Sequence, residues 1–358
     1  MNLPRHRPRN GQPFLLAVNY HYLGSAHRYP YPGIIGITPG EFAEQVDLLG
    51  RHLEFVGAGE LEKAALGEGE LPRNAAVITF DDGLKEQFAE AVPILEGKQI
   101  PFICFVNTAP LAEGRACFIH KLHYLRSVVA PGQFLSRVRE VAAEKFGLVL
   151  ADPDRLEVPP GYYPYDEPPA RAVKFLLNFF LDTATSVGIV DQLFGEQCDE
   201  GEFCRWFYLS ASEVRELQGR FQAIGMHGHS HRSLASLAEA EARREIALCS
   251  ALLEEITGRA PSCISYPFGY RESVSLQVAQ LAKAQGARFG FTMEMCLNRD
   301  VARHPLLLGR INNNEAPGHP RAALSFEGPQ PVLLDPSRLA MSRRWFGDDS
   351  VPPVHQEV

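Results

Sequence analysis

Two adjacent aspartates, Asp81 and Asp82, directly follow an apolar segment that reads Val-Ile-Thr-Phe and is typical of a buried strand. Carboxylates side by side at the end of such a strand repel each other and lose solvent, so a cation must compensate them or one must hold a proton. A divalent metal ion would neutralise both. Suitable histidines follow a second short apolar segment, at His227, His229 and His231. The sequence therefore predicts one divalent-metal site built from both segments.

Each of these motifs also has a plainer interpretation. Asp-Asp-Gly is common in turns, and a His-x-His-x-His run occurs in solvated loops. We expect His229 to be a bystander or to support the ligands, and direct ligation by it stays open. His21, after the first apolar segment, is either a substrate contact or an ordinary strand-end histidine. His120 and His123 share one helix face by their i, i+3 spacing, which we interpret as packing or solvation rather than ligation.

The composition is that of an ordinary globular protein, with 358 residues, 45% hydrophobic, 22% charged, and a formal charge of -8. No basic tract of the kind that binds phosphates is present, so nucleic acid is not expected as a partner. No apolar run approaches the roughly 20 residues that span a bilayer, and the one near the start is too short for a signal-peptide core. Seven cysteines without a CxxC pair fit a reducing compartment. We expect a cytoplasmic protein.

Strand-like and helical patterns alternate along the chain, which favours a parallel sheet or barrel over a sandwich. The first strand is predicted at residues 14–18, followed by a helix whose start is marked by the capping-box pair Thr38 and Glu41. A long helix is predicted over residues 239–257, with Gly258 as its left-handed stop. The last strand of the pattern is predicted at residues 306–311.

The alternation breaks between residues 110 and 205, where we predict a folded insertion that caps the barrel. It carries helical patterns at residues 132–146 and 170–185, and an aromatic, proline-rich stretch at residues 158–165 that would roof a cleft. The predicted organisation is an N-terminal arm at 1–13, a barrel at 14–325 interrupted by the insertion at 110–205, and a C-terminal tail at 326–358.

In parallel α/β folds, ligands bind where the carboxyl ends of the strands meet. Four polar clusters fall at such ends: His21, the Asp81 pair, the His227 cluster, and the turn Tyr-Pro-Phe-Gly that starts at Tyr266. We therefore expect them to lie around one site.

The motifs Thr-Phe-Asp-Asp-Gly at residues 79–83, His-Gly-His-Ser-His at 227–231 and Tyr-Pro-Phe-Gly at 266–269 resemble those of the polysaccharide deacetylases of carbohydrate esterase family four, the NodB homology domain. The order and spacing match as well. The resemblance covers about residues 14–110 and 205–312. It implies an α/β fold, a distorted (β/α) barrel of the NodB type, with the large, mostly helical insertion outside the resemblance.

The resemblance also implies one divalent ion, usually zinc, held by Asp82, His227 and His231. The residue types agree, because two histidines and one carboxylate leave a coordination position open, as in catalytic zinc sites. Cobalt, nickel and iron are alternatives. Asp81 would be the general base, and a backbone N–H near Tyr266 would help to stabilise the oxyanion. Pro267, Phe268 and His21 would then line the substrate site, and His229 would stand behind the ligands.

Two positions depart from the family pattern. Many members carry an arginine in the third motif that braces the catalytic aspartate, whereas this chain has Ser265, so Asp81 must be oriented otherwise. Many also carry a late Leu-x-His motif that supplies the general acid, whereas residues 306–311 contain no histidine. His304 lies just upstream and is either the acid or a cap of the following strand. Arg310 is not a candidate for the acid, because a guanidinium does not donate its proton at neutral pH.

From these features we expect a metal-dependent hydrolase that removes an N-acyl group, most simply N-acetyl, from an amino sugar or glycan precursor of a surface polysaccharide. Two alternatives stay open. One is hydrolysis of another amide, such as a formamide or a cyclic imide, by the same site. The other is a catalytically silent carbohydrate-binding protein on the same fold.

Overall fold

The computed structural model describes residues 13–24, 28–150, 167–270, 272–327 and 330–333. Its centre is a parallel sheet with strand order β7-β6-β5-β4-β3-β1-β8, in which β2 also pairs with β3. The strands are β1 (Phe14–Tyr20), β2 (Glu54–Phe55), β3 (Asn74–Phe80), β4 (Phe102–Val106), β5 (Ile224–Met226), β6 (Cys263–Ser265), β7 (Phe289–Phe291) and β8 (Ile311–Asn312).

The two edges of this sheet are joined by one segment of chain. Leu308 forms a parallel bridge with Phe291 of β7, and three residues later Ile311 pairs in parallel with Val18 of β1. The strands therefore curl into an irregular ring, and the predicted distorted (β/α) barrel is confirmed.

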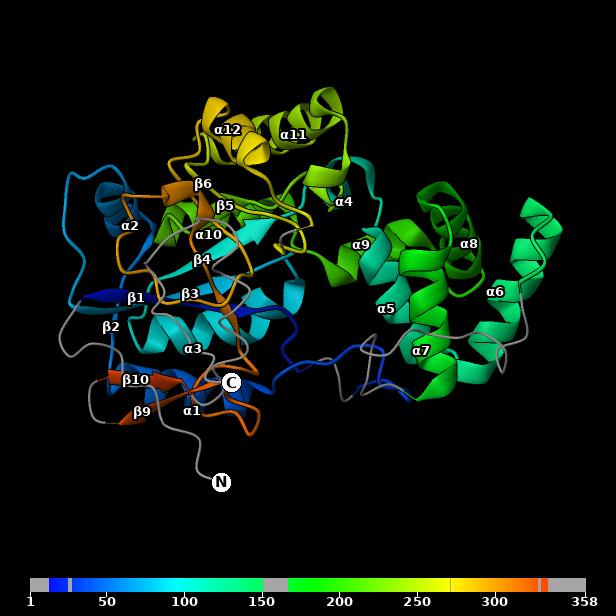
Figure 1. Ribbon diagram of the computed structural model, residues 1–358, viewed down its shortest axis with the longest axis horizontal. Helices are drawn as coiled ribbons and strands as arrows, with labels where there is room; N and C mark the ends of the chain where they lie inside the picture. Colours follow the sequence, from blue (N-terminus) through cyan, green and yellow to red (C-terminus); the bar gives the residue numbers. More distant parts are fainter. Residues whose placement is uncertain (1–12, 25–27, 151–166, 271, 328–329, 334–358) are drawn as a thin grey trace, which may run out of the picture.

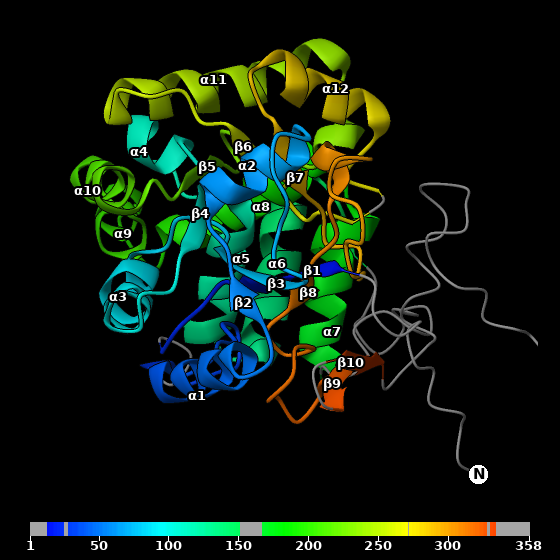
Figure 2. The ribbon, with the colours of Figure 1, turned by 90° about the vertical axis from the view of Figure 1, so that its left-hand side faces the viewer.

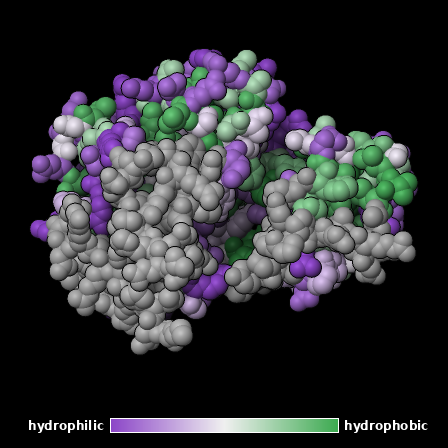
Figure 3. All heavy atoms as spheres, viewed as in Figure 1, coloured by the Kyte–Doolittle hydropathy of each residue, from purple (hydrophilic) through white to green (hydrophobic). Residues whose placement is uncertain are grey.

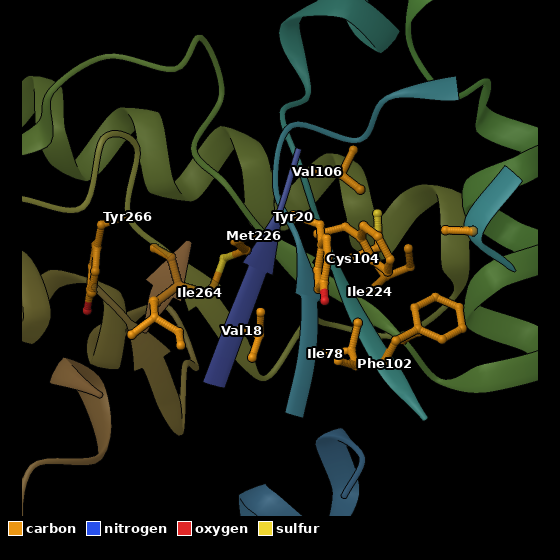
Figure 4. Packing of buried hydrophobic residues seen from close by; sticks show 14 of the residues in the cluster. Val18, Tyr20, Ile78, Phe102, Cys104, Val106, Ile224, Met226, Ile264 and Tyr266 are labelled. Carbon is orange, nitrogen blue, oxygen red and sulfur yellow. The ribbon is translucent and has the colours of Figure 1, made fainter. Parts of the chain in front are cut away.

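Side chains alternate between the two faces of the strands, as the pleat of a β-strand requires. One face, with Val18, Tyr20 and Met226 among its residues, belongs to the largest apolar cluster (Figure 4). The other face contributes a smaller cluster drawn from five strands, together with Val56, Leu61, Ala65 and Leu308.

Helices surround the strands. Figure 2 shows α11 and α12 on one side, α3 and α10 on a second, and α1 on a third. These helices are α1 (Pro39–Gly50), α2 (Ala58–Ala65), α3 (Val92–Gly97), α10 (Ala211–Phe221), α11 (Glu239–Thr257) and α12 (Leu276–Ala284). The predicted capping box of Thr38 and Glu41 is present, and α11 ends at Gly258 with a φ of 73°.

Between β4 and β5 lies a group of helices beside the barrel, toward which the carboxyl end of β4 points (Figure 1). It contains α4 (Ala109–Glu113), α5 (Phe118–Val128), α6 (Pro131–Phe146), α7 (Pro168–Phe175), α8 (Thr183–Gly195) and α9 (Glu200–Phe207). A separate apolar cluster holds it together, with Val138, Ile189 and Phe203 fully buried. On the face drawn in Figure 3, a hollow separates this helical part from the barrel. The stretch 158–165 lies outside the described residues.

Two predicted elements differ from the structure. The helix predicted at residues 170–185 is divided into α7, a π-turn at Leu176–Phe180 and α8, because Asp182 caps α8 by accepting a hydrogen bond from the Thr185 N–H. Instead of a strand over 306–311, a 3₁₀ turn at Pro305–Leu307 precedes the short β8. A hairpin of β9 (Leu324–Glu327) and β10 (Gln330–Leu333) spans the predicted start of the tail.

The domain boundaries stay predictions, because residues 1–12 and 334–358 lie outside the described part. In that part, none of the helices is both long and apolar enough to cross a membrane.

Candidate metal centre

Three turns at the carboxyl ends of the strands carry a non-glycine residue in the left-handed region. They are Asp82 with φ 77°, His231 with φ 58° and Phe268 with φ 63°. Aspartate tolerates this conformation, but for a bulky residue such as Phe268 it is an outlier. Such strain persists only where the surrounding structure fixes it, and it clusters at functional sites.

Asp82, His227 and His231 offer ligand atoms that all lie within 4.8 Å of one another, as the sequence predicted. The Nε2 atoms of His227 and His231 each lie 3.4 Å from Oδ1 of Asp82. A tetrahedral ion with bonds of about 2.1 Å separates its ligand atoms by about 3.4 Å. Oδ1 of Asp82 is buried and has no hydrogen-bond partner, although buried polar atoms normally have one. These three residues therefore fit a divalent metal ion.

The two histidines differ in how their surroundings prepare them for ligation. Nδ1 of His227 lies 2.8 Å from the carbonyl oxygen of Ser265, so the neutral ring donates its hydrogen there and keeps the lone pair on Nε2. Burial by itself lowers the pKa of His227, but the charges of Asp81 and Asp82 outweigh it and raise that pKa. Burial lowers the pKa of His231 to about 3, so this ring is neutral at physiological pH.

The second oxygen of Asp82 has a partner that the sequence analysis missed. Nε2 of His120, on α5, lies 3.0 Å from Oδ2 of Asp82, and Nδ1 of His120 lies 2.5 Å from the hydroxyl of Tyr208. All three side chains are buried. Burial alone would raise the pKa of Asp82, but His120 is the main group that lowers it well below its usual range.

Asp81 is held by three hydrogen bonds. Arg310 donates from Nη1 to Oδ1 at 2.9 Å and from Nη2 to Oδ2 at 2.7 Å. Nδ2 of Asn19 donates to Oδ2 at 2.9 Å. Burial alone would raise the pKa of Asp81, but the guanidinium of Arg310 outweighs it and lowers that pKa strongly. Asp81 is therefore ionised at neutral pH.

Arg310 is fully buried and explains the departure at Ser265. Its Nη2 donates to Oγ of Ser265 at 2.7 Å, and its guanidinium carbon lies 5.8 and 5.6 Å from the ring centroids of Phe105 and Phe291. The aspartate is thus braced by an arginine that enters from the segment before β8 instead of from the third motif. Nothing in the residues around Arg310 in the sequence indicates this bracing role, because Asp81 lies 229 residues away along the chain.

The remaining predicted residues take different places around the centre. His21 is half-buried. Burial lowers its pKa, and the charges of Asp82 and Asp81 oppose this by raising it, but they do not outweigh burial. The exposed ring of Phe268 packs edge-on against His231 at 4.7 Å. Pro267 is buried and packs over Gly228. His229 joins Thr108 to Glu113 through its two ring nitrogens, which is an outer position.

Tyr266 contacts the segment before β8, to which His304 belongs. The ring of Tyr266 is fully buried, its hydroxyl donates to the Leu306 carbonyl and its N–H donates to the Phe291 carbonyl. The N–H of Tyr266 already donates within the sheet, and the prediction of an oxyanion donor applies to the other N–H groups of this turn. His304 precedes the Leu308 bridge to β7, so the chain direction carries it toward the amino end of that strand. Its role as an acid stays a prediction.

Comparison with protein-family models matches residues 179–288 to the polysaccharide deacetylase family. The match contains His227, His231 and Tyr266, whereas the Asp81–Asp82 motif precedes it. Comparison with the curated proteins finds no match.

Solved structures of similar fold include IcaB from Ammonifex degensii, 17% identical, with 93% of this chain and 97% of that chain covered and a TM-score of 0.49. The Streptococcus pyogenes deacetylase PplD in complex with acetate is 14% identical, with coverages of 84% and 92% and a TM-score of 0.49. The BpsB deacetylase domain from Bordetella bronchiseptica is 15% identical, with coverages of 85% and 97% and a TM-score of 0.48. The resemblance of this chain to the polysaccharide deacetylase family, first indicated by its motifs, is confirmed by the family model.

Proposed function

We propose that this protein is a metal-dependent hydrolase that removes an N-acyl group, most simply N-acetyl, from an amino sugar of a surface polysaccharide or its precursor. The family likeness supports hydrolytic deacetylation of a carbohydrate. The observation that carries the proposal is the convergence of Asp82, His227 and His231 beside an ionised carboxylate, Asp81, that is not one of the three ligands.

A divalent ion held by the three ligands would polarise the amide carbonyl and lower the pKa of an attacking water. The protein's own contribution is the placement of Asp81. A carboxylate has about four lone-pair sites, and Arg310 and Asn19 occupy three of them. One site remains from which Asp81 can accept the proton of the water as the general base.

The exposed ring of Phe268 packs against the candidate ligand His231. An aromatic face next to a metal ligand gives a sugar ring an apolar surface to stack on. The open side of the centre would then receive the acyl group while the sugar lies against Phe268.

The test combines metal content with acetate release from acetylated amino sugars. We expect about one divalent ion per chain, lost in Asp82→Ala and in the double variant His227→Ala/His231→Ala. Asp81→Asn keeps the shape of the side chain, so it should retain the ion while turnover falls by about 10²–10⁴-fold.

A wild type that stays metal-free after reconstitution with zinc would rule out the hydrolase. A wild type that binds the ion and the sugar, yet releases neither acetate nor formate, would favour the silent binding protein.

A further inference from the structure

Resting on the proposed function, we propose that the helical insertion completes the metal centre: His120 on α5 holds the ligand Asp82 in its binding orientation, and Tyr208 holds His120. The juxtaposition joins three segments that are distant in sequence. Asp82 follows β3, His120 belongs to the first turn of α5, and Tyr208 directly follows α9.

The two oxygens of Asp82 have different environments, which separates ligation from support. Oδ1 is 3.4 Å from each histidine ligand and has no hydrogen-bond partner. Oδ2 is 3.0 Å from Nε2 of His120, a distance within the range of an N–H···O hydrogen bond. His120 is also not part of the group of ligand atoms within 4.8 Å of one another. It therefore acts on the ion through Asp82.

The hydrogen atoms follow from the chain of contacts. The N–H of Cys117 donates to the hydroxyl oxygen of Tyr208 at 3.0 Å. The hydroxyl can then donate its own hydrogen to Nδ1 of His120, which leaves Nε2 with the hydrogen that it donates to Asp82. We call the chain of hydrogen bonds from Tyr208 through His120 to Asp82 the relay. All three side chains are buried, so water does not compete for these groups.

The hydrogen bond from His120 fixes the orientation of the Asp82 carboxylate. Asp82 sits in a left-handed turn with φ 77°, and a carboxylate with only one supported oxygen keeps its rotamer only if that support is rigid. The anchoring of Tyr208 is rigid because Tyr208 also bridges Leu84, two residues beyond Asp82, and the next N–H, of Leu209, donates to the Gly83 carbonyl at 2.9 Å.

The test measures zinc affinity of the full-length protein by competition with a chromophoric chelator, together with the absorption spectrum of the cobalt(II) form. We expect His120→Leu to weaken zinc binding by about 10–100-fold, as loss of an outer partner of a metal ligand usually does. His120→Gln should lose less, because its amide N–H can replace the Nε2–H, and Tyr208→Phe should fall between wild type and His120→Leu.

His123→Leu is the matched control. His123 lies one turn further on the same helix and bonds to the hydroxyl of Tyr22 at 2.9 Å, so its loss removes a contact of α5 but none of the hydrogen bonds that join Tyr208, His120 and Asp82. Its zinc affinity and cobalt spectrum should equal those of the wild type.

Wild-type affinity in His120→Leu, or an equal loss in His123→Leu, would overturn the inference while leaving the hydrolase intact. Absence of zinc binding in the wild type would remove both.

Discussion

At the scale of single residues, the centre depends on charges that are buried together. Asp81 and Arg310 are 2% and 0% exposed, so neither has water as an alternative partner. The two groups form a bidentate ion pair, so each charge is compensated by the other. Asn19 also donates to Asp81, and Ser265 accepts from Arg310. Buried pairs of this kind add little net stability, but removal of one partner leaves a buried charge uncompensated.

Arg310→Met should therefore lower the free energy of unfolding by about 3–5 kcal/mol, and chemical denaturation measures it. Adding Asp81→Asn to Arg310→Met should recover part of this loss, because the orphaned carboxylate is then neutral. Arg310→Lys keeps the charge but not the planar fork, so it should fold better than Arg310→Met and still lose turnover. Equal unfolding free energies for the single and double variants would contradict the pairing.

Phe268 offers a separate test of strain and stacking. Because its φ is 63°, Phe268→Gly should be more stable than Phe268→Ala by about 1 kcal/mol, as thermal unfolding would show. Both changes remove the exposed ring, so both should raise KM for the sugar substrate while kcat changes less. If KM stayed at the wild-type value in both variants, Phe268 would not be a substrate platform.

Only some of the residues of the site could be predicted from the sequence, and the difference has a physical reason. Asp82, His227 and His231 occur in short motifs directly after apolar strands, so strand geometry alone predicts that they converge. Arg310 and His120 act on Asp81 and Asp82 across 229 and 38 residues, through contacts that exist only once the ring has closed and the helices have docked. No local pattern distinguishes such residues from others on a strand end or helix face.

At the scale of elements, local signals worked where capping residues mark the boundary. The capping box of Thr38 and Glu41 correctly predicts the start of α1, and the left-handed Gly258 correctly predicts the end of α11. The segment before β8 was predicted as a longer strand because its apolar run does not reveal a 3₁₀ turn that begins at Pro305. Gly309 is packed so closely against the Glu294 carbonyl that a Cβ there would clash, a constraint invisible in the sequence.

The π-helix at Gln87–Ala91 supports the turn that holds Asp81 and Asp82, here called the aspartate turn. The contacts come from its first residue, Gln87. Nε2 of Gln87 donates to the carbonyl oxygens of Asp81 and His21, at 2.7 and 2.9 Å, and Oε1 accepts from the Leu84 N–H at 3.1 Å. Gln87→Met should lower the free energy of unfolding by about 1–3 kcal/mol, because these buried groups lose their partner. It should also weaken zinc binding.

Gln45→Met is the control for this prediction. Gln45 is also buried and bonds the hydroxyl of Tyr20 and the Asn313 carbonyl, but it does not bond the aspartate turn. Both variants should lose stability, as urea denaturation would show, whereas zinc affinity should fall only in Gln87→Met. A similar fall in both would mean that Gln87 contributes only to general stability.

At the scale of the whole molecule, two apolar cores are joined near the metal centre. The barrel holds one cluster of buried side chains on each face of its strands, and the helical insertion holds a separate one. Leu84, two residues after Asp82 in the barrel, belongs to the cluster of the insertion and pairs with Tyr208, and His120 of the insertion contacts Asp82 itself. Metal binding is therefore expected to be transmitted to the insertion as well as to the barrel.

An ion that binds only the folded state stabilises it by mass action, by about 2.7 kcal/mol when free zinc is 100 times its dissociation constant. Zinc should thus raise the unfolding free energy by about this amount, and a chelator should reverse the change. Amide hydrogen exchange then locates the effect: protection should increase around Asp82 and His227, and also at the start of α5, where the Cys117 N–H bonds Tyr208. The interior of α6, which bonds none of the ligands in the described contacts, should exchange at an unchanged rate. If protection increased only at the barrel turns, zinc binding would not be transmitted to the insertion. The barrel and the insertion would then be coupled by packing alone.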